Sequence, residues 1–214
     1  LYELGHAVYD YYCDSTLPWL LRGAAHSLTT EAVANFFGRL ASNPHWLVKS
    51  VGVPEETANG IAEDCKRTLR LEQLVFNRWA QVVVRFERAM YENPDQDLNA
   101  LWYSLVEKYQ LLSPLEGRNE PDWAAKIHIA LYPVYYHNYV LGELLASQLA
   151  ATIGKNVFGS ENPFANSFAG NPEVGAMFKE RVFLPGSRYR WAEMIERATG
   201  EKLTARYYAR QFVY

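Results

Sequence analysis

Residues 69–90 read LRLEQLVFNRWAQVVVRFERAM, and this stretch decides the fold class. Its apolar residues recur at three- and four-residue spacing, which is the period of an amphipathic α-helix. They are Leu69, Leu71, Leu74, Val75, Trp79, Val82, Val83, Phe86 and Met90. The same period continues along most of the chain, and strand signals are sparse. The sequence therefore predicts an all-α protein.

Pro, Gly, Asn and Ser interrupt this periodicity at intervals and predict where the helices begin and end. The breaks indicate about eight to ten helices, with bounds accurate to about 2–4 residues. The helices we would place are near residues 1–13, 28–42, 55–92, 95–111, 123–155, 172–181, 188–198 and 202–211. One extended loop is expected from Gly154 to Asn171, either as a flap over a site or as a surface excursion, which is the commoner case.

Composition narrows the class of protein. A length of 214 residues with 49% apolar residues fits one helical domain over residues 1–214. The 21 basic and 24 acidic residues are interspersed, so no basic stripe favours nucleic acid. No apolar run approaches the ~20 residues of a membrane span. Cys13 and Cys65 indicate neither a disulfide framework nor a thiolate zinc site. We expect a soluble protein, and the sequence does not indicate its cellular compartment.

The first six residues, Leu1-Tyr2-Glu3-Leu4-Gly5-His6, open a helical pattern without a capping residue. The chain is therefore expected to start within a helix, as an excised, proteolysed or truncated piece of something longer. Glu3 and His6 also match the last four residues of H-E-x-x-H, in which two His one turn apart bind zinc and the Glu polarises the attacking water. Position 2, where the first His belongs, is Tyr.

An isolated E-x-x-H tetrad occurs by chance in many helices, but two further blocks accompany it. Residues 17–32 read LPWLLRGAAHSLTTEA and contain Glu31, which can also be read as a first-turn residue favoured by the helix dipole. Residues 126–139 contain KIHI and, after a short interval, VYYHNY. Together these blocks resemble the C-terminal, active-site half of the angiotensin-converting-enzyme family of zinc metallopeptidases. Related oligopeptidase families are neighbouring candidates.

The resemblance implies a zincin-like, all-α peptidase half-domain and a role for each matching residue. His6 and Glu31 would be zinc ligands and Glu3 the general base. Lys126 and Tyr136 would bind the carboxylate at the peptide's C-terminus. His128 would hydrogen-bond a substrate carbonyl or oxyanion, and Tyr139 would stabilise the oxyanion, with the register of the two tyrosines open by one position. These residues are expected to converge on one concave surface.

An aromatic-rich helix is more often core than catalytic machinery, so at least two of the four tyrosines between residues 132 and 139 are expected to be packing residues with satisfied hydroxyls. His26, His45 and His137 match nothing catalytic and are expected to be surface or capping residues. Asn138 stands where animal enzymes of the family carry a chloride-binding Arg, so chloride activation is not expected.

Two departures bear on activity. Tyr2 places a phenol, with an ordinary pKa of ~10, where a zinc-binding imidazole belongs. Asn35 replaces an Asp that supports the zinc ligands in the family. Zinc is therefore expected to be weakly bound or absent, and the chain to be inactive by itself. The opposite wall of the cleft would come from a missing N-terminal half or a second copy. The alternative is a non-catalytic remnant or interaction protein on the same scaffold.

Overall fold

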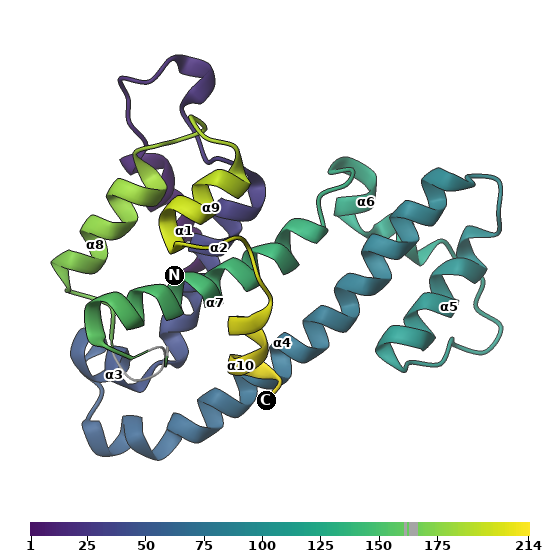
Figure 1. Cartoon of the computed structure of the whole chain (residues 1–214). Coiled ribbons are helices and arrows are strands. Elements are labelled where there is room, and N and C mark those ends of the chain that lie inside the picture. The colour runs from purple at the N-terminus through teal and green to yellow at the C-terminus, as the bar shows by residue number, and fades with distance from the viewer. Residues whose placement is uncertain (161, 163–166) are drawn as a thin grey trace. The chain divides into compact units, whose positions relative to one another are not determined.

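A computed structural model of the chain describes residues 1–160, 162 and 167–214, and over these residues it contains ten α-helices and no strands (Figure 1). The all-α prediction is therefore confirmed. The helices are α1 (Tyr2–Tyr12), α2 (Ser27–Gly38), α3 (Pro44–Trp46), α4 (Glu55–Glu92), α5 (Leu98–Gln110), α6 (Ile127–Leu131), α7 (His137–Phe158), α8 (Pro172–Phe178), α9 (Trp191–Thr199) and α10 (Arg206–Phe212). Within the described ranges, none is long and apolar enough to span a membrane.

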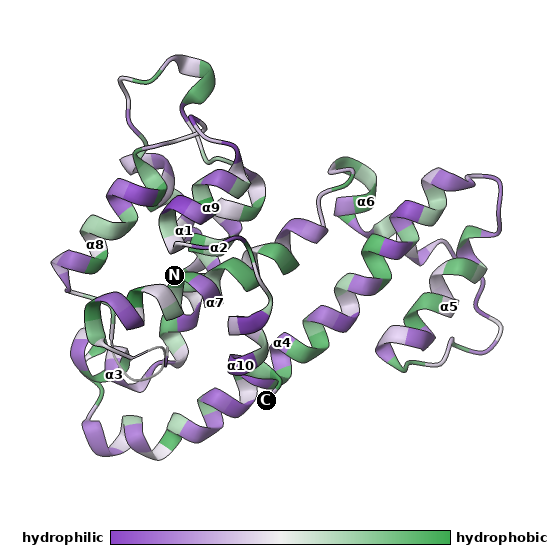
Figure 2. Ribbon diagram, in the orientation of Figure 1, coloured by the Kyte–Doolittle hydropathy of each residue, from purple (hydrophilic) through white to green (hydrophobic). Residues whose placement is uncertain are grey.

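The chain divides into two compact units, each described here by itself. The first comprises Leu1–Arg70 and Leu141–Tyr214, and the second comprises Leu71–Val140. Figure 2 shows hydrophobic and hydrophilic residues alternating along α4, as the periodicity predicts. The assignment of residues 1–214 to a single domain stays a prediction beside this division.

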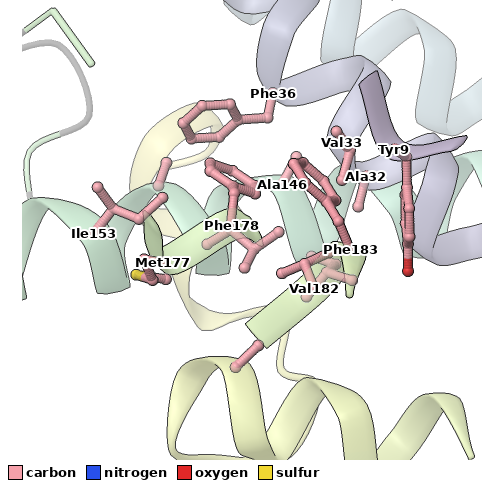
Figure 3. Packing of buried hydrophobic residues seen from close by; sticks show 14 of the residues in the cluster. Tyr9, Ala32, Val33, Phe36, Ala146, Ile153, Met177, Phe178, Val182 and Phe183 are labelled. Atoms are coloured by element: carbon pink, nitrogen blue, oxygen red, sulfur yellow. The ribbon is translucent and has the colours of Figure 1, made fainter. Parts of the chain in front are cut away.

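The core of the first unit is built from α1, α2, α7, α8, α9 and the π-helical turn Lys179–Phe183. Figure 3 shows part of this cluster, in which Phe36 of α2 faces Phe178 of α8. Their ring centroids are 4.9 Å apart in an edge-to-face arrangement, and Phe178 stacks on Phe183 at 5.6 Å. Tyr9 of α1 is fully buried in the same cluster. These aromatic contacts fix α1 and α2 against the rest of the unit.

The core of the second unit lies where α4, α5 and α6 meet. Phe86 and Trp102 pack edge to face with centroids 5.1 Å apart, and Ile129 of α6 is buried against the same cluster. The fold therefore holds the short α6 and the residues just before it against the C-terminal half of α4.

The predicted helix over 123–155 is wrong in its middle. Pro133 lacks a backbone N–H and disfavours helical conformation at Tyr132, so α6 ends at Leu131 and α7 begins only at His137. Val134 lies between them at a φ of 54°, a left-handed conformation that β-branched residues rarely adopt. The expected loop from Gly154 also starts late, because α7 continues to Phe158, and its residues 161 and 163–166 lie outside the described residues.

Helix α2 begins at a cap formed by His26, one of the three histidines expected to be surface or capping residues. The side chain of His26 accepts a hydrogen bond from the backbone N–H of Leu28 at 3.2 Å, and the Thr29 hydroxyl lies 3.2 Å from the His26 backbone N–H. His26 is therefore confirmed as a capping residue, and this cap orients the helix that carries Glu31.

Candidate functional site

In the first unit, α1 and α2 bring Tyr2, His6 and Glu31 together. Tyr2 and His6 stand one turn apart on α1, with ring centroids 5.0 Å apart. Tyr2 donates its hydroxyl hydrogen to Oε2 of Glu31, and Nε2 of His6 lies 3.8 Å from the same oxygen. Nδ1 of His6 lies 2.7 Å from the hydroxyl of Thr30, which fixes the orientation of the ring.

Two glycines allow the helices to approach closely enough for these contacts. A Cβ at Gly5 of α1 would lie 2.6 Å from Cα of Ala34 on α2. A Cβ at Gly142 of α7 would lie 2.7 Å from Cβ of Glu31. Glu31 is consequently only 3% exposed, although its carboxylate meets side chains of α1. A buried carboxylate needs such partners, because an isolated charge away from water is strongly disfavoured.

The donor set does not fit the zinc site that the sequence resemblance implies. His6 Nε2 and Glu31 Oε2 are near the ~3.3 Å separation of two ligands on tetrahedral zinc. The third donor is the neutral phenol of Tyr2, and it already donates to the carboxylate that zinc would need. Over the described part of the chain, no group of three or more His, Cys, Asp or Glu side chains is arranged to hold a metal ion.

Two further residues of this region are on the periphery. Glu3, the predicted general base, is exposed on α1, one residue after Tyr2. Asn35 of α2 is half-buried, four residues after Glu31, and its uncharged amide cannot raise the basicity of an imidazole as a carboxylate would.

In the second unit, Lys126 and Tyr136 lie against Trp79 of α4. The indole Nε1–H of Trp79 donates a hydrogen bond of 2.6 Å to the Tyr136 hydroxyl oxygen. Nζ of Lys126 lies 5.5 Å from the ring centroid of Trp79 and 5.2 Å from that of Tyr136. Tyr136 is 5% exposed, and its burial raises its pKa, while the hydrogen bond from Trp79 partly opposes this rise. Its phenol therefore stays neutral at physiological pH.

His128 and Tyr139 form a second pair beside the first. Nε2 of His128 lies 3.0 Å from the Tyr139 hydroxyl oxygen, and the direction of this hydrogen bond depends on the imidazole tautomer. The ring of His128 stands edge to face with Tyr136 at 5.0 Å, and the rings of Tyr136 and Tyr139 are 5.2 Å apart. All four residues predicted on this segment are thus within one cluster of the second unit.

The turn between α6 and α7 is held by a buried acid that sequence reasoning missed. Oε1 of Glu87 on α4 accepts hydrogen bonds from the backbone N–H of Val134 and from the hydroxyl of Tyr91. Glu87 is 6% exposed, so it fixes the left-handed residue from inside the unit. The contacts of Trp79 with the site were missed too, because its place in the apolar period of residues 69–90 indicates only a core residue. A charged residue on the apolar side of that helix was the available signal for Glu87.

The expected convergence of Glu3, His6 and Glu31 with Lys126, His128 and Tyr139 stays a prediction. The first three belong to the first compact unit and the last three to the second. Each group is assembled within its own unit.

Comparison with known proteins identifies one family and two solved structures with a similar fold. A family model described as angiotensin-converting enzyme, peptidase M2, matches residues 1–210. No curated protein matches the chain. A solved structure described as BsuCP is 21% identical with a TM-score of 0.73, over 96% of this chain and 45% of that one. An M32 carboxypeptidase from Deinococcus radiodurans R1 is 23% identical with a TM-score of 0.74, over 99% and 47%. The chain spans less than half the length of these structures.

Proposed function

Because the chain belongs to the angiotensin-converting-enzyme family of peptidases, we propose that it is the half of a peptidyl-dipeptidase-like enzyme that recognises a peptide's C-terminus, and that it does not hydrolyse the peptide by itself. The observation that carries this proposal is the hydrogen bond from the Tyr2 phenol to Glu31. It puts a neutral donor where the family resemblance requires a metal ligand.

Recognition of the peptide is assigned to Lys126 and Tyr136. The ammonium of Lys126 supplies a positive charge, and the phenol of Tyr136, whose oxygen accepts from Trp79, can donate its own hydrogen to a carboxylate. The two groups lie together, since Nζ of Lys126 is 5.2 Å from the Tyr136 ring. The fold neighbour named as a carboxypeptidase supports a substrate that ends in a free carboxylate.

His128 and Tyr139 are proposed to hydrogen-bond the peptide carbonyl nearest to that carboxylate. Their 3.0 Å contact places the two polar atoms side by side, with one hydrogen between them. Both groups can donate to one carbonyl oxygen only when the peptide replaces this hydrogen bond and His128 carries a hydrogen on Nε2. Donors of this kind strengthen as negative charge develops on a carbonyl oxygen, which is how the family resemblance assigns them an oxyanion role.

Hydrolysis is not expected, because Glu3 lacks an activated water. A carboxylate can take a proton from water efficiently only where the pKa of that water has been lowered from its ordinary ~15.7. Tyr2, His6 and Glu31 do not form a site that would hold the zinc required for this. We therefore derive binding, and no chemical step, from these residues.

A non-catalytic interaction protein is the second candidate, and an apolar pocket in the first unit favours it. The pocket has a volume of about 570 Å³ and is lined by Leu1 and by residues of α1, α2 and α8, among them Leu4, Phe36, Phe37 and Phe178. Leu1 and Leu4, which line this pocket, are 43% and 50% exposed, so apolar side chains continue from the pocket onto the surface of the unit. We propose that an N-terminal half or a second copy covers this face, and light scattering at increasing concentration would detect the second copy.

The test of the proposed function is binding and turnover of one short peptide. Calorimetry should show tighter binding of the peptide with a free C-terminus than of its C-terminal amide. Lys126→Ala should weaken binding of the free acid at least about tenfold, the loss of a charge-assisted hydrogen bond. Lys108→Ala is the matched control, because Lys108 also lies over a tyrosine ring, at 5.5 Å from that of Tyr109, and is not one of the residues predicted to bind the peptide.

Mass spectrometry should recover the peptide intact after incubation with the unmodified chain and zinc. Equal affinity for the acid and the amide would refute the recognition role. Chelator-sensitive cleavage by the unmodified chain would refute the proposed lack of hydrolysis.

A further inference from the structure

Trp79 touches both residues to which the proposed function assigns carboxylate binding. Its indole N–H donates to the Tyr136 oxygen at 2.6 Å, and its ring lies 5.5 Å from the ammonium of Lys126. The family resemblance gave this residue no role. It stands on α4, far in sequence from both partners.

The hydrogen bond decides how the Tyr136 hydroxyl is oriented. An indole N–H is a donor only, so the phenol oxygen must act as the acceptor. The phenol then turns its own hydrogen away from Trp79 and can donate it to another group. Tyr136 is 5% exposed, so few waters compete for these directions. A fixed donor beside a positive charge is the arrangement that recognises one oxygen of a carboxylate.

The indole itself is held rigidly. Its ring packs edge to face against Trp102 of α5, with centroids 5.7 Å apart and planes at 89°. Trp102 in turn packs against Phe86 in the core of the second unit. A side chain fixed in this way keeps the partners that it contacts in one geometry.

We propose that Trp79 is a positioning residue for the carboxylate of the peptide, because it orients the Tyr136 hydroxyl and carries the Lys126 ammonium on its ring. This inference rests on the proposed function and extends it to a residue behind the binding pair. Trp79 acts through Lys126 and Tyr136 and is not itself assigned a contact with the peptide.

Trp79→Phe separates the hydrogen bond from the packing, because it keeps an aromatic ring and removes the N–H. The variant should bind the free-acid peptide about fivefold more weakly, which corresponds to the loss of one net hydrogen bond. Binding of the C-terminal amide should not change. Trp123→Phe is the matched control, since it removes another indole hydrogen bond of the same unit, the one of 2.9 Å to Asn99.

A second readout does not depend on any peptide. The hydrogen bond from Trp79 stabilises the ionised phenol, so its removal should raise the pKa of Tyr136 further, as measured by NMR with Tyr136→Phe for assignment. An unchanged pKa, or an unchanged preference for the acid over the amide, would overturn the role of Trp79. If the unmodified chain itself shows no such preference, the proposed function fails and the role of Trp79 fails with it.

Discussion

Replacing Tyr2 by Phe tests the contact that distinguishes this site from a zinc site. The substitution removes only the hydroxyl that donates to Glu31 and leaves the ring against His6. Glu31 is 3% exposed, so water cannot replace the lost donor without opening the interface between α1 and α2. Hydrogen bonds to charged groups contribute ~1.5–3 kcal/mol, and Tyr2 is only half-buried. We therefore expect Tyr2→Phe to lower the free energy of unfolding by about 1–2 kcal/mol.

For a chain of this size, that loss corresponds to a fall in melting temperature of about 2–8 °C. Urea unfolding followed by circular dichroism would measure the free energy directly. Tyr11→Phe is the matched control, because Tyr11 lies on the same helix, is 80% exposed and should change the stability by less than ~0.5 kcal/mol. If Tyr2→Phe and Tyr11→Phe have equal, small effects, the hydroxyl does not hold Glu31 as described.

Two further predictions concern the same unit. Gly142→Ala should destabilise the protein by about 1–3 kcal/mol, because the added Cβ would lie 2.7 Å from a side-chain carbon of α2. Gly175→Ala on α8 is the control, since its Cβ would meet nothing within 4 Å and the change should be neutral or stabilising. Thermal unfolding of the two variants compares their stabilities. Burial raises the pKa of Tyr9 in the folded state above its ordinary ~10. The stability that this shift contributes is therefore present below that pH and is lost as pH rises through the folded pKa. In Tyr9→Phe, the midpoint of urea unfolding should fall less steeply at alkaline pH than in the unmodified chain.

Much of the fold follows from local signals in the sequence. The bounds of α4 agree with the predicted 55–92 because Pro54 precedes the helix and Asn93-Pro94 follow it. The break between α6 and α7 was also in the sequence, at Pro133, but the helical periodicity on either side outweighed it in the prediction. Helix α3 was missed, because it has only three residues and no apolar period to reveal it.

The candidate site, like the fold, could be predicted from the sequence only in part. Spacing along one helix predicts that Tyr2 and His6 share a face of α1. The same spacing argument does not apply to Tyr136 and Tyr139, because Tyr136 precedes α7, although their rings lie 5.2 Å apart. The contact between Tyr2 and Glu31 depends on how closely two helices approach, which Gly5 permits but does not reveal by its position in the sequence. The role of Trp79 was equally hidden, because a residue that supports a site from the core has the same pattern as one that only packs.

The central claim is that Tyr2 prevents this chain from holding zinc, and metal analysis of the unmodified chain beside Tyr2→His tests it most directly. His6 and Glu31 already lie 3.8 Å apart, so an imidazole at position 2 would complete three ligands from two helices. After dialysis against zinc, the variant should retain close to one zinc ion per chain and the unmodified chain almost none. Stoichiometric zinc in the unmodified chain, or none in Tyr2→His although it is folded, would contradict the account.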